Sequence, residues 1–171
     1  TFEYPAYGQV MFEDYDSCRF DIRFRKQEVR WHITLEWLSD DFGYHAAAEK
    51  YRGMVHTHSQ KGRVYEEPID NAEGLGRLYE LYGEVPSPAT AFYSDSTNWA
   101  LEMAVYLPTA LKNDSLAPMI EHMKGELKHT LQTFRFTGTQ ETHRPQATEA
   151  GCDYPTAGKW YGNRPHNLLD K

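Results

Sequence analysis

The chain has 171 residues, of which 40% are hydrophobic and 14% aromatic, so it can bury the core of one globular domain. Its net charge of −7, without a cluster of Lys and Arg, argues against nucleic-acid binding, because phosphate neutralisation needs concentrated positive charge. No apolar run approaches the ~20 residues that cross a bilayer, and we expect a chain that begins at Thr1 to be a fragment or a processed form that has lost an export signal.

Alternating apolar and polar residues predict paired strands in the first part of the chain. Residues 1–12 suggest two short extended pieces around a turn, and the segments RFDIRF (19–24) and VRWHITL (29–35) each place their apolar residues on one face. The outward-facing sets are Arg19, Asp21 and Arg23 in the first segment and Arg30, His32 and Thr34 in the second. Lys26-Gln27 is a plausible hairpin connection, so we expect these strands to pair over one core.

The next segment changes to a helical period. A helix is predicted after an N-cap at Ser39 or Asp40, because a run of three alanines follows, and Gly62 is a reasonable end point. We expect a loop over 64–74 that contains a short strand near 66–69. Strand character then resumes.

A polar turn separates two predicted strands later in the chain. The segment LGRLYELYGEV (75–85) predicts a strand, and 90–94 and 99–107 form the arms of a hairpin around Asp95–Asn98. A nucleophilic serine needs a base that a third group orients, and no histidine lies nearby in sequence. Asp and Asn suit turn geometry and bond to their own backbone. We therefore interpret Asp95–Asn98 as a structural turn whose carboxylate and hydroxyls bond backbone N–H groups.

The clearest predicted element is a helix from Ser115 to Leu131. Its apolar stripe consists of Leu116, Met119, Ile120, Met123, Leu127 and Leu131. Asp114 or Ser115 caps its start, and Pro118 lies in the first turn, where a missing N–H is harmless. The segment TFRF (133–136) then predicts a final short strand. Together these elements predict an α+β fold in which a mostly antiparallel sheet of about five to seven strands is packed by two main helices.

Beyond this domain the composition changes. We assign 1–137 to a single α+β domain and 138–171 to an irregular C-terminal tail rich in Gly, Pro and Thr. The tail aromatics could bind a glycan or a partner, or cover a gap left by absent N-terminal residues; they are Tyr154, Trp160 and Tyr161. The two cysteines, Cys18 and Cys152, could pair in an oxidising compartment or be unrelated thiols.

Histidines supply the only candidate metal ligands. His122, Glu126 and His129 lie on one face of the predicted helix, so two of them could bind a metal whose third ligand comes from elsewhere. Such a face is more often solvated, and the same holds for His56 and His58, which diverge on a helix. No phosphate-binding glycine motif is present, and we predict no cofactor.

Several motifs together resemble one protein family. A strand ending at Gly83, the turn Asp95-Ser96-Thr97, the helix start Asp114-Ser115-Leu116-Ala117-Pro118 and the aromatic segment 134–136 occur in this order in the gliding-motility lipoprotein family GldD. The similarity covers roughly 1–136. The family is found in bacteria that carry the type IX secretion machinery, and its fold looks similar to the Mog1/PsbP type of sandwich.

The resemblance implies a function and a location. It implies a non-catalytic cell-envelope lipoprotein, facing the periplasm, that contacts other gliding and secretion proteins and associates with a membrane only through an N-terminal lipid upstream of Thr1. It also implies that Cys18 could have a partner upstream, which leaves pairing with Cys152 open. Ser96 and Ser115 fit a three-residue O-glycosylation pattern of the bacterial group in which the family occurs.

Two other classes of function stay open from the residues. One is an envelope hydrolase or metal-dependent enzyme that uses His122, Glu126 or His129. The other is a module that binds a glycan or a small molecule through the tail aromatics.

Overall fold

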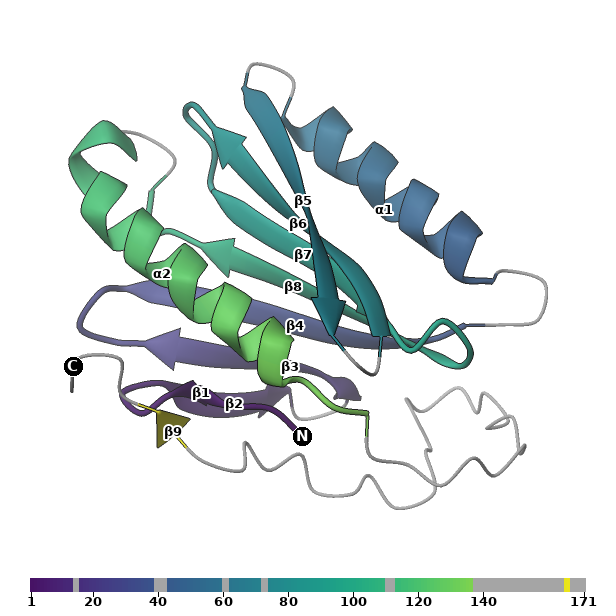
Figure 1. Cartoon of the computed structure of the whole chain (residues 1–171). Helices are drawn as coiled ribbons and strands as arrows, with labels where there is room; N and C mark the ends of the chain where they lie inside the picture. Colours follow the sequence, from purple (N-terminus) through teal and green to yellow (C-terminus); the bar gives the residue numbers. More distant parts are fainter. Residues whose placement is uncertain are drawn as a thin grey trace.

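The computed structural model describes residues 1–13, 16–38, 43–59, 62–71, 74–109, 113–136 and 165–166. Most of these residues form one curved sheet with a helix on either side (Figure 1). The strands are β1 (Tyr4–Pro5), β2 (Gln9–Glu13), β3 (Asp16–Phe24), β4 (Val29–Trp37), β5 (Arg63–Asn71), β6 (Gly74–Tyr82), β7 (Ala89–Ser94), β8 (Trp99–Tyr106) and β9 (Pro165–His166). The helices are α1 (Tyr44–His58) and α2 (Asn113–Thr133).

The main sheet has seven strands in the order β2-β3-β4-β8-β7-β6-β5. Every neighbouring pair in it is antiparallel, and the two-residue strands β1 and β9 form a separate parallel pair. The α+β class, the mostly antiparallel sheet and the two main helices predicted from the sequence are confirmed. In the described part of the chain, neither helix is both long and apolar enough to cross a membrane.

The predicted pairing of the first two long strands is confirmed. In the β3–β4 ladder Phe20 lies opposite Ile33, and Ile22 lies opposite Trp31. All four side chains are buried in the same core, because residues two apart on a strand point to the same face. The charged residues between them must therefore face the other side of the sheet.

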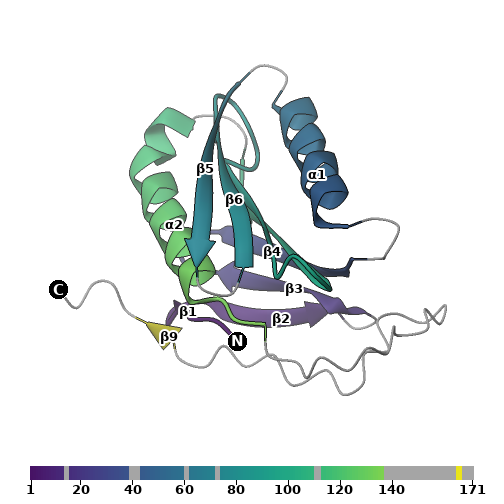
Figure 2. The same cartoon turned by 45° about the vertical axis from the view of Figure 1, so that its right-hand side comes forward.

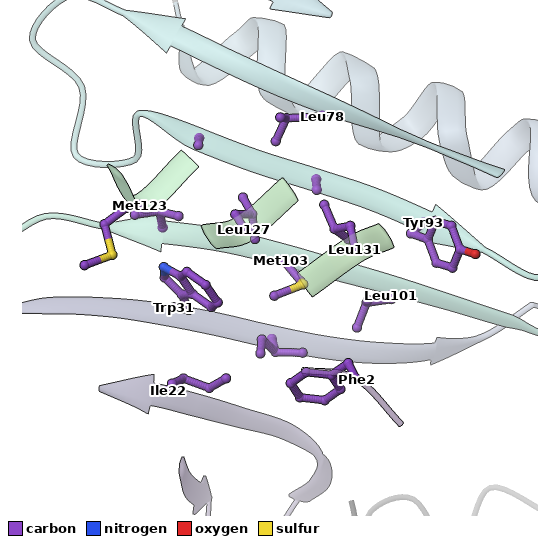
Figure 3. Close-up of a cluster of buried hydrophobic side chains, with 14 of the residues drawn as sticks. Phe2, Ile22, Trp31, Leu78, Tyr93, Leu101, Met103, Met123, Leu127 and Leu131 are labelled. Carbon is purple, nitrogen blue, oxygen red and sulfur yellow. The ribbon is translucent and has the colours of Figure 1, made fainter. Parts of the chain in front are cut away.

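Helix α2 packs against one face of the sheet. Its residues Met123, Leu127 and Leu131 are fully buried and pack against side chains of β3, β4, β6, β7 and β8 (Figure 3). This part of the face is apolar, with Trp31 and Met103 near its centre. The apolar stripe predicted for this helix is thus the part of the chain that closes the main core.

Helix α1 covers only part of the opposite face. Its buried residues Ala47, Tyr51 and Val55 pack against Tyr79 and Phe92 of β6 and β7. Figure 2 shows α1 and α2 on opposite sides of the sheet, with α1 away from β2 and β3. The polar side chains of β3 and β4 on this face therefore have no helix above them among the described residues.

Three expected boundaries differ from the structure. Residues 64–71, expected as a loop with a short strand near 66–69, all belong to β5, which is an edge strand, where Pro68 can be accommodated without breaking a ladder. The expected final strand over 133–136 is absent, because Phe134 turns into the core and stacks on Phe2. Helix α1 begins after Gly43; Ser39 and Asp40 lie outside the described residues.

Gly62 has a different role from the predicted helix stop. A Cβ atom at this position would lie 2.2 Å from the carbonyl oxygen of Tyr82, so only glycine allows the chain to pass so close to β6.

Cys18 of β3 is buried and disulfide-bonded, whereas Cys152 lies outside the described residues.

Candidate functional site

The part of the α1 face that no described helix covers carries a group of charged and polar side chains. We call it the polar strip. It consists of Arg19, Asp21 and Arg23 of β3, Arg30, His32, Thr34 and Glu36 of β4, and Glu102 and Tyr106 of β8. These side chains are exposed or half-buried except Asp21, which is buried. The strip follows directly from strand alternation, which sends the intervening apolar residues to the α2 face.

The ladder arranges the strip in rows across three strands. One row joins Arg23, Arg30 and Tyr106, and another joins Arg19, Thr34 and Glu102. Between them Asp21 lies opposite His32. Neighbours within a row are close enough for their side chains to interact, so charges on separate strands act as one group.

A buried carboxylate organises one end of the strip. Only 6% of the Asp21 side chain is exposed, and its Oδ1 lies 3.0 Å from Nδ1 of His32. Its Oδ2 lies 3.5 Å from the guanidinium groups of both Arg23 and Arg30. The Arg30 guanidinium also lies 4.9 Å from the centre of the Tyr106 ring. Two arginines against one carboxylate leave a net positive charge at this end.

The other end of the strip holds two carboxylates. Burial, and after it the neighbouring carboxylate of Glu36, raise the pKa of Glu102 to about 6, while Lys50, His32 and Arg19 act in the opposite direction. The β4–β8 register makes Glu36 and Glu102 diagonal neighbours on one face. A half-buried carboxylate beside a like charge is costly for the fold, and such groups occur often at functional sites.

Helix α1 packs against the sheet beside the strip. Tyr51 is buried, its hydroxyl contacts the Thr90 hydroxyl, and Thr90 donates to the carbonyl of Met103 at 2.8 Å. Burial raises the pKa of Tyr51, so it stays a neutral hydrogen-bonding group. The strip therefore offers fixed charges beside a packed helix, an arrangement suited to ion pairs with another molecule.

The turn between β7 and β8 is held by its own side chains. Asp95 Oδ1 accepts hydrogen bonds from the backbone N–H groups of Thr97, Asn98 and Trp99 at 2.9, 2.8 and 3.0 Å. Ser96 has a φ of 67° and its N–H donates to Ser94 Oγ at 2.9 Å. The predicted bonding of the turn carboxylate to backbone N–H groups is confirmed.

Comparison with known families identifies the chain. The family model of the gliding motility lipoprotein GldD matches residues 1–136. The chain belongs to this family. The match confirms the resemblance drawn from the sequence motifs, and it implies a role in gliding motility and an envelope-anchored location. GldD is not a known enzyme family. The comparisons with curated proteins and with solved structures gave no match.

The predicted metal-ligand candidates of this GldD-family chain bind other side chains. His122 Nε2 lies 2.6 Å from the Tyr7 hydroxyl and 3.7 Å from the buried carboxylate of Glu126. His129 Nε2 lies 2.9 Å from Oε2 of Glu3. Burial and the Glu126 charge raise the pKa of Tyr7 to about 12. Within the described ranges no group of three or more His, Cys, Asp or Glu could hold a metal ion.

The remaining candidates occupy varied surroundings. His56 and His58 are exposed near the end of α1, and His56 Nε2 lies 3.0 Å from Glu66 Oε1 on β5. Ser96 and Ser115 are exposed, and their O-glycosylation stays a prediction. The tail aromatics Tyr154, Trp160 and Tyr161 lie outside the described residues.

A buried lysine joins α2 to the sheet. Lys124 of α2 is buried, and its ammonium group donates to Glu80 at 2.8 Å and to Glu121 at 2.9 Å. The same ammonium lies 4.4 Å from the centre of the Tyr82 ring. These contacts fasten α2 to β6, so Lys124 has a structural role.

Sequence reasoning placed the charged residues of β3 and β4 on the outward face but did not weigh them as a site. The available signal was the charge pattern itself, with three arginines and one aspartate on the outward faces of two adjacent strands. Glu36 and Glu102 gave no such signal, because only the β4–β8 pairing brings them together.

Proposed function

We propose that this GldD-family chain is a non-catalytic lipoprotein of the gliding and type IX secretion apparatus, and that it acts through protein contacts made by the polar strip. The lipid-anchored domain faces the periplasm, where it meets its protein partners. The observation that carries this proposal is the charged face beside α1. Helix α1 closes the rest of this side of the sheet with an apolar contact, so the charged part is the part left for another molecule.

The energetics of the strip support a binding role. Glu102 is half-buried beside Glu36, and this repulsion raises its pKa, so the ionised pair lowers the stability of the free domain. A partner that brings positive charge to this place would relieve the repulsion. Natural proteins commonly tolerate such destabilised groups where function needs them.

The basic end of the strip allows a direct test. We expect Arg30→Gln to reduce gliding at least tenfold when it replaces the native residue in the gene, because it removes a positive charge while Arg23 remains to pair with Asp21. Arg63→Gln is the matched control, since Arg63 is also an exposed arginine on a strand but lies on β5, away from the strip.

Gliding would be measured as the speed of single cells, with immunoblots to confirm equal protein levels. Loss of gliding with Arg30→Gln but not with Arg63→Gln supports the polar strip as the docking surface. Normal gliding of the Arg30→Gln strain at normal abundance would refute it.

A further inference from the structure

The dimensions of the polar strip limit what can occupy it. It spans the three neighbouring strands β3, β4 and β8. Adjacent strands lie about 4.8 Å apart, so the outer two are roughly 10 Å apart, which is about the diameter of one α-helix with its side chains. Helix α1 already covers the adjoining strands β6 and β7 on this face. One further helix beside α1 would complete the layer on this side of the sheet.

The length of the strip gives a second dimension. Glu36 at the acidic end lies six positions along β4 from Arg30 at the basic end. At about 3.4 Å per residue the two ends are roughly 20 Å apart, and a helix covers that distance in about 14 residues. A partner helix would therefore carry its two charged groups about 14 residues, or roughly four turns, apart, because this spacing also returns both groups to the same face of the helix.

The backbone of the sheet favours a helix over an extended peptide. Strands β3, β4 and β8 each pair with neighbours on both sides, so their backbone groups are engaged within the sheet. A peptide laid flat on this face in extended form would have no backbone partners, whereas a helix bonds its own N–H and C=O groups. Recognition then depends on side chains, and the side chains of the strip are charged.

From these features we propose that the polar strip receives one helix of a partner protein, with anionic side chains over Arg23 and Arg30 and cationic side chains, about 14 residues away on the same face of that helix, over Glu36 and Glu102. This inference rests on the proposed docking function. Lys50, His32 and Arg19 also face Glu102, so the cationic contact is directed at the exposed carboxylate of Glu36 first.

A photo-cross-linking residue in the middle of the strip tests the occupant. Thr34→p-benzoylphenylalanine, made by amber suppression in gliding cells, places the probe between the two charged ends. The same probe at Arg63 is the matched control. After illumination, mass spectrometry of the purified adduct identifies which segment of which protein is attached.

We expect an adduct from position 34 but not from position 63. The attached segment should be helical, with acidic and basic residues about 14 positions apart on one face. The yield of the adduct should fall at least tenfold when Glu36→Lys or Arg30→Gln is added. An adduct to a loop, to a strand, to lipid or to this chain itself would overturn the inference, as would no adduct or one insensitive to both substitutions.

The two experiments distinguish a wrong helical occupant from a wrong docking surface. If Arg30→Gln stops gliding but the adduct maps to a loop or a strand, the docking surface stands and the helical occupant is wrong. If the Arg30→Gln strain glides normally, the docking function itself is wrong.

Discussion

The two faces of the sheet are built from the same strands and differ in almost everything else. The α2 face is apolar over β3, β4, β7 and β8 and is closed by Met123, Leu127 and Leu131. The α1 face is apolar only over β6, β7 and the end of β8, and it carries the polar strip over β3, β4 and the rest of β8. The difference separates two tasks, because burial on the first face supplies stability, whereas the second face keeps Glu102 beside the like charge of Glu36 at a cost to stability.

The largest expected effect is on the α2 face. Met123 is fully buried, so Met123→Asp places an unpaired charge in the main core and should lower the free energy of unfolding by about 4 kcal/mol. Urea denaturation measures this, with Ala117→Asp on the exposed side of the same helix as the control. A Met123→Asp protein that unfolds at the same urea concentration as the parent would show that the stripe does not close the core.

The turn between β7 and β8 maintains the alternation that separates the faces. A slip of one residue in this hairpin would exchange apolar and polar positions. Asp95→Ala removes the acceptor of three backbone N–H groups and should cost about 2 kcal/mol. Thermal unfolding followed by circular dichroism checks this, and a change below a few tenths of a kcal/mol would mean that the carboxylate does not hold the turn.

Glu102 tests whether the charges of the strip lower the free energy of unfolding. Its pKa rises from 4.5 to about 6 on folding, so the folded state takes up a proton more readily than the unfolded state. The cost of ionising Glu102 in the folded protein is therefore absent below the lower value and complete above the higher one. Glu102→Gln should stabilise the domain by about 1 kcal/mol at pH 7.5 and have little effect at pH 4.5.

Denaturation curves across this pH range give the result. A Glu102→Gln variant that is less stable than the parent at pH 7.5 would contradict the cost assigned to the carboxylate. Glu49→Gln, on the exposed side of α1, should show no such pH dependence and serves as the control.

The smallest effect concerns Ser96 at the tip of the same turn. Its positive φ is a conformation that glycine adopts without strain, so Ser96→Gly should stabilise the domain by up to about 1 kcal/mol. Ser96→Ala should change stability by about 1 kcal/mol or less and leave gliding intact. Loss of gliding with Ser96→Ala at normal abundance would make the exposed turn, in place of the strip, a functional surface.

Local sequence patterns correctly predicted the elements that bury one face along their whole length. Alternation in 19–24 and 29–35 predicted β3 and β4, and the stripe ending at Leu131 predicted α2, because in each case one face is buried along its whole length. Strand β5 was predicted only as a short piece near 66–69, because an edge strand can hold Pro68 and two adjacent glutamates, with Ile69 as a buried residue.

The candidate site was less accessible to sequence reasoning. Its members are brought together by strand pairing between residues far apart in the chain, as with Glu36 and Glu102. The same holds for His122, whose partner Tyr7 lies 115 residues away. Burial of Asp21 on an otherwise open face also depends on two neighbouring arginines and could not be deduced from alternation alone. The domain boundary at residue 137 stays a prediction.

Glu36→Lys tests most directly whether the polar strip keeps the destabilising pair Glu36 and Glu102 because a partner binds there. Glu36 is exposed, and reversing its charge replaces repulsion of Glu102 by attraction. The same substituted protein should therefore unfold at a higher temperature than the parent and yet fail to support gliding, whereas Glu49→Lys should leave gliding intact. A Glu36→Lys strain that glides normally, with the protein present at normal levels, would contradict the account.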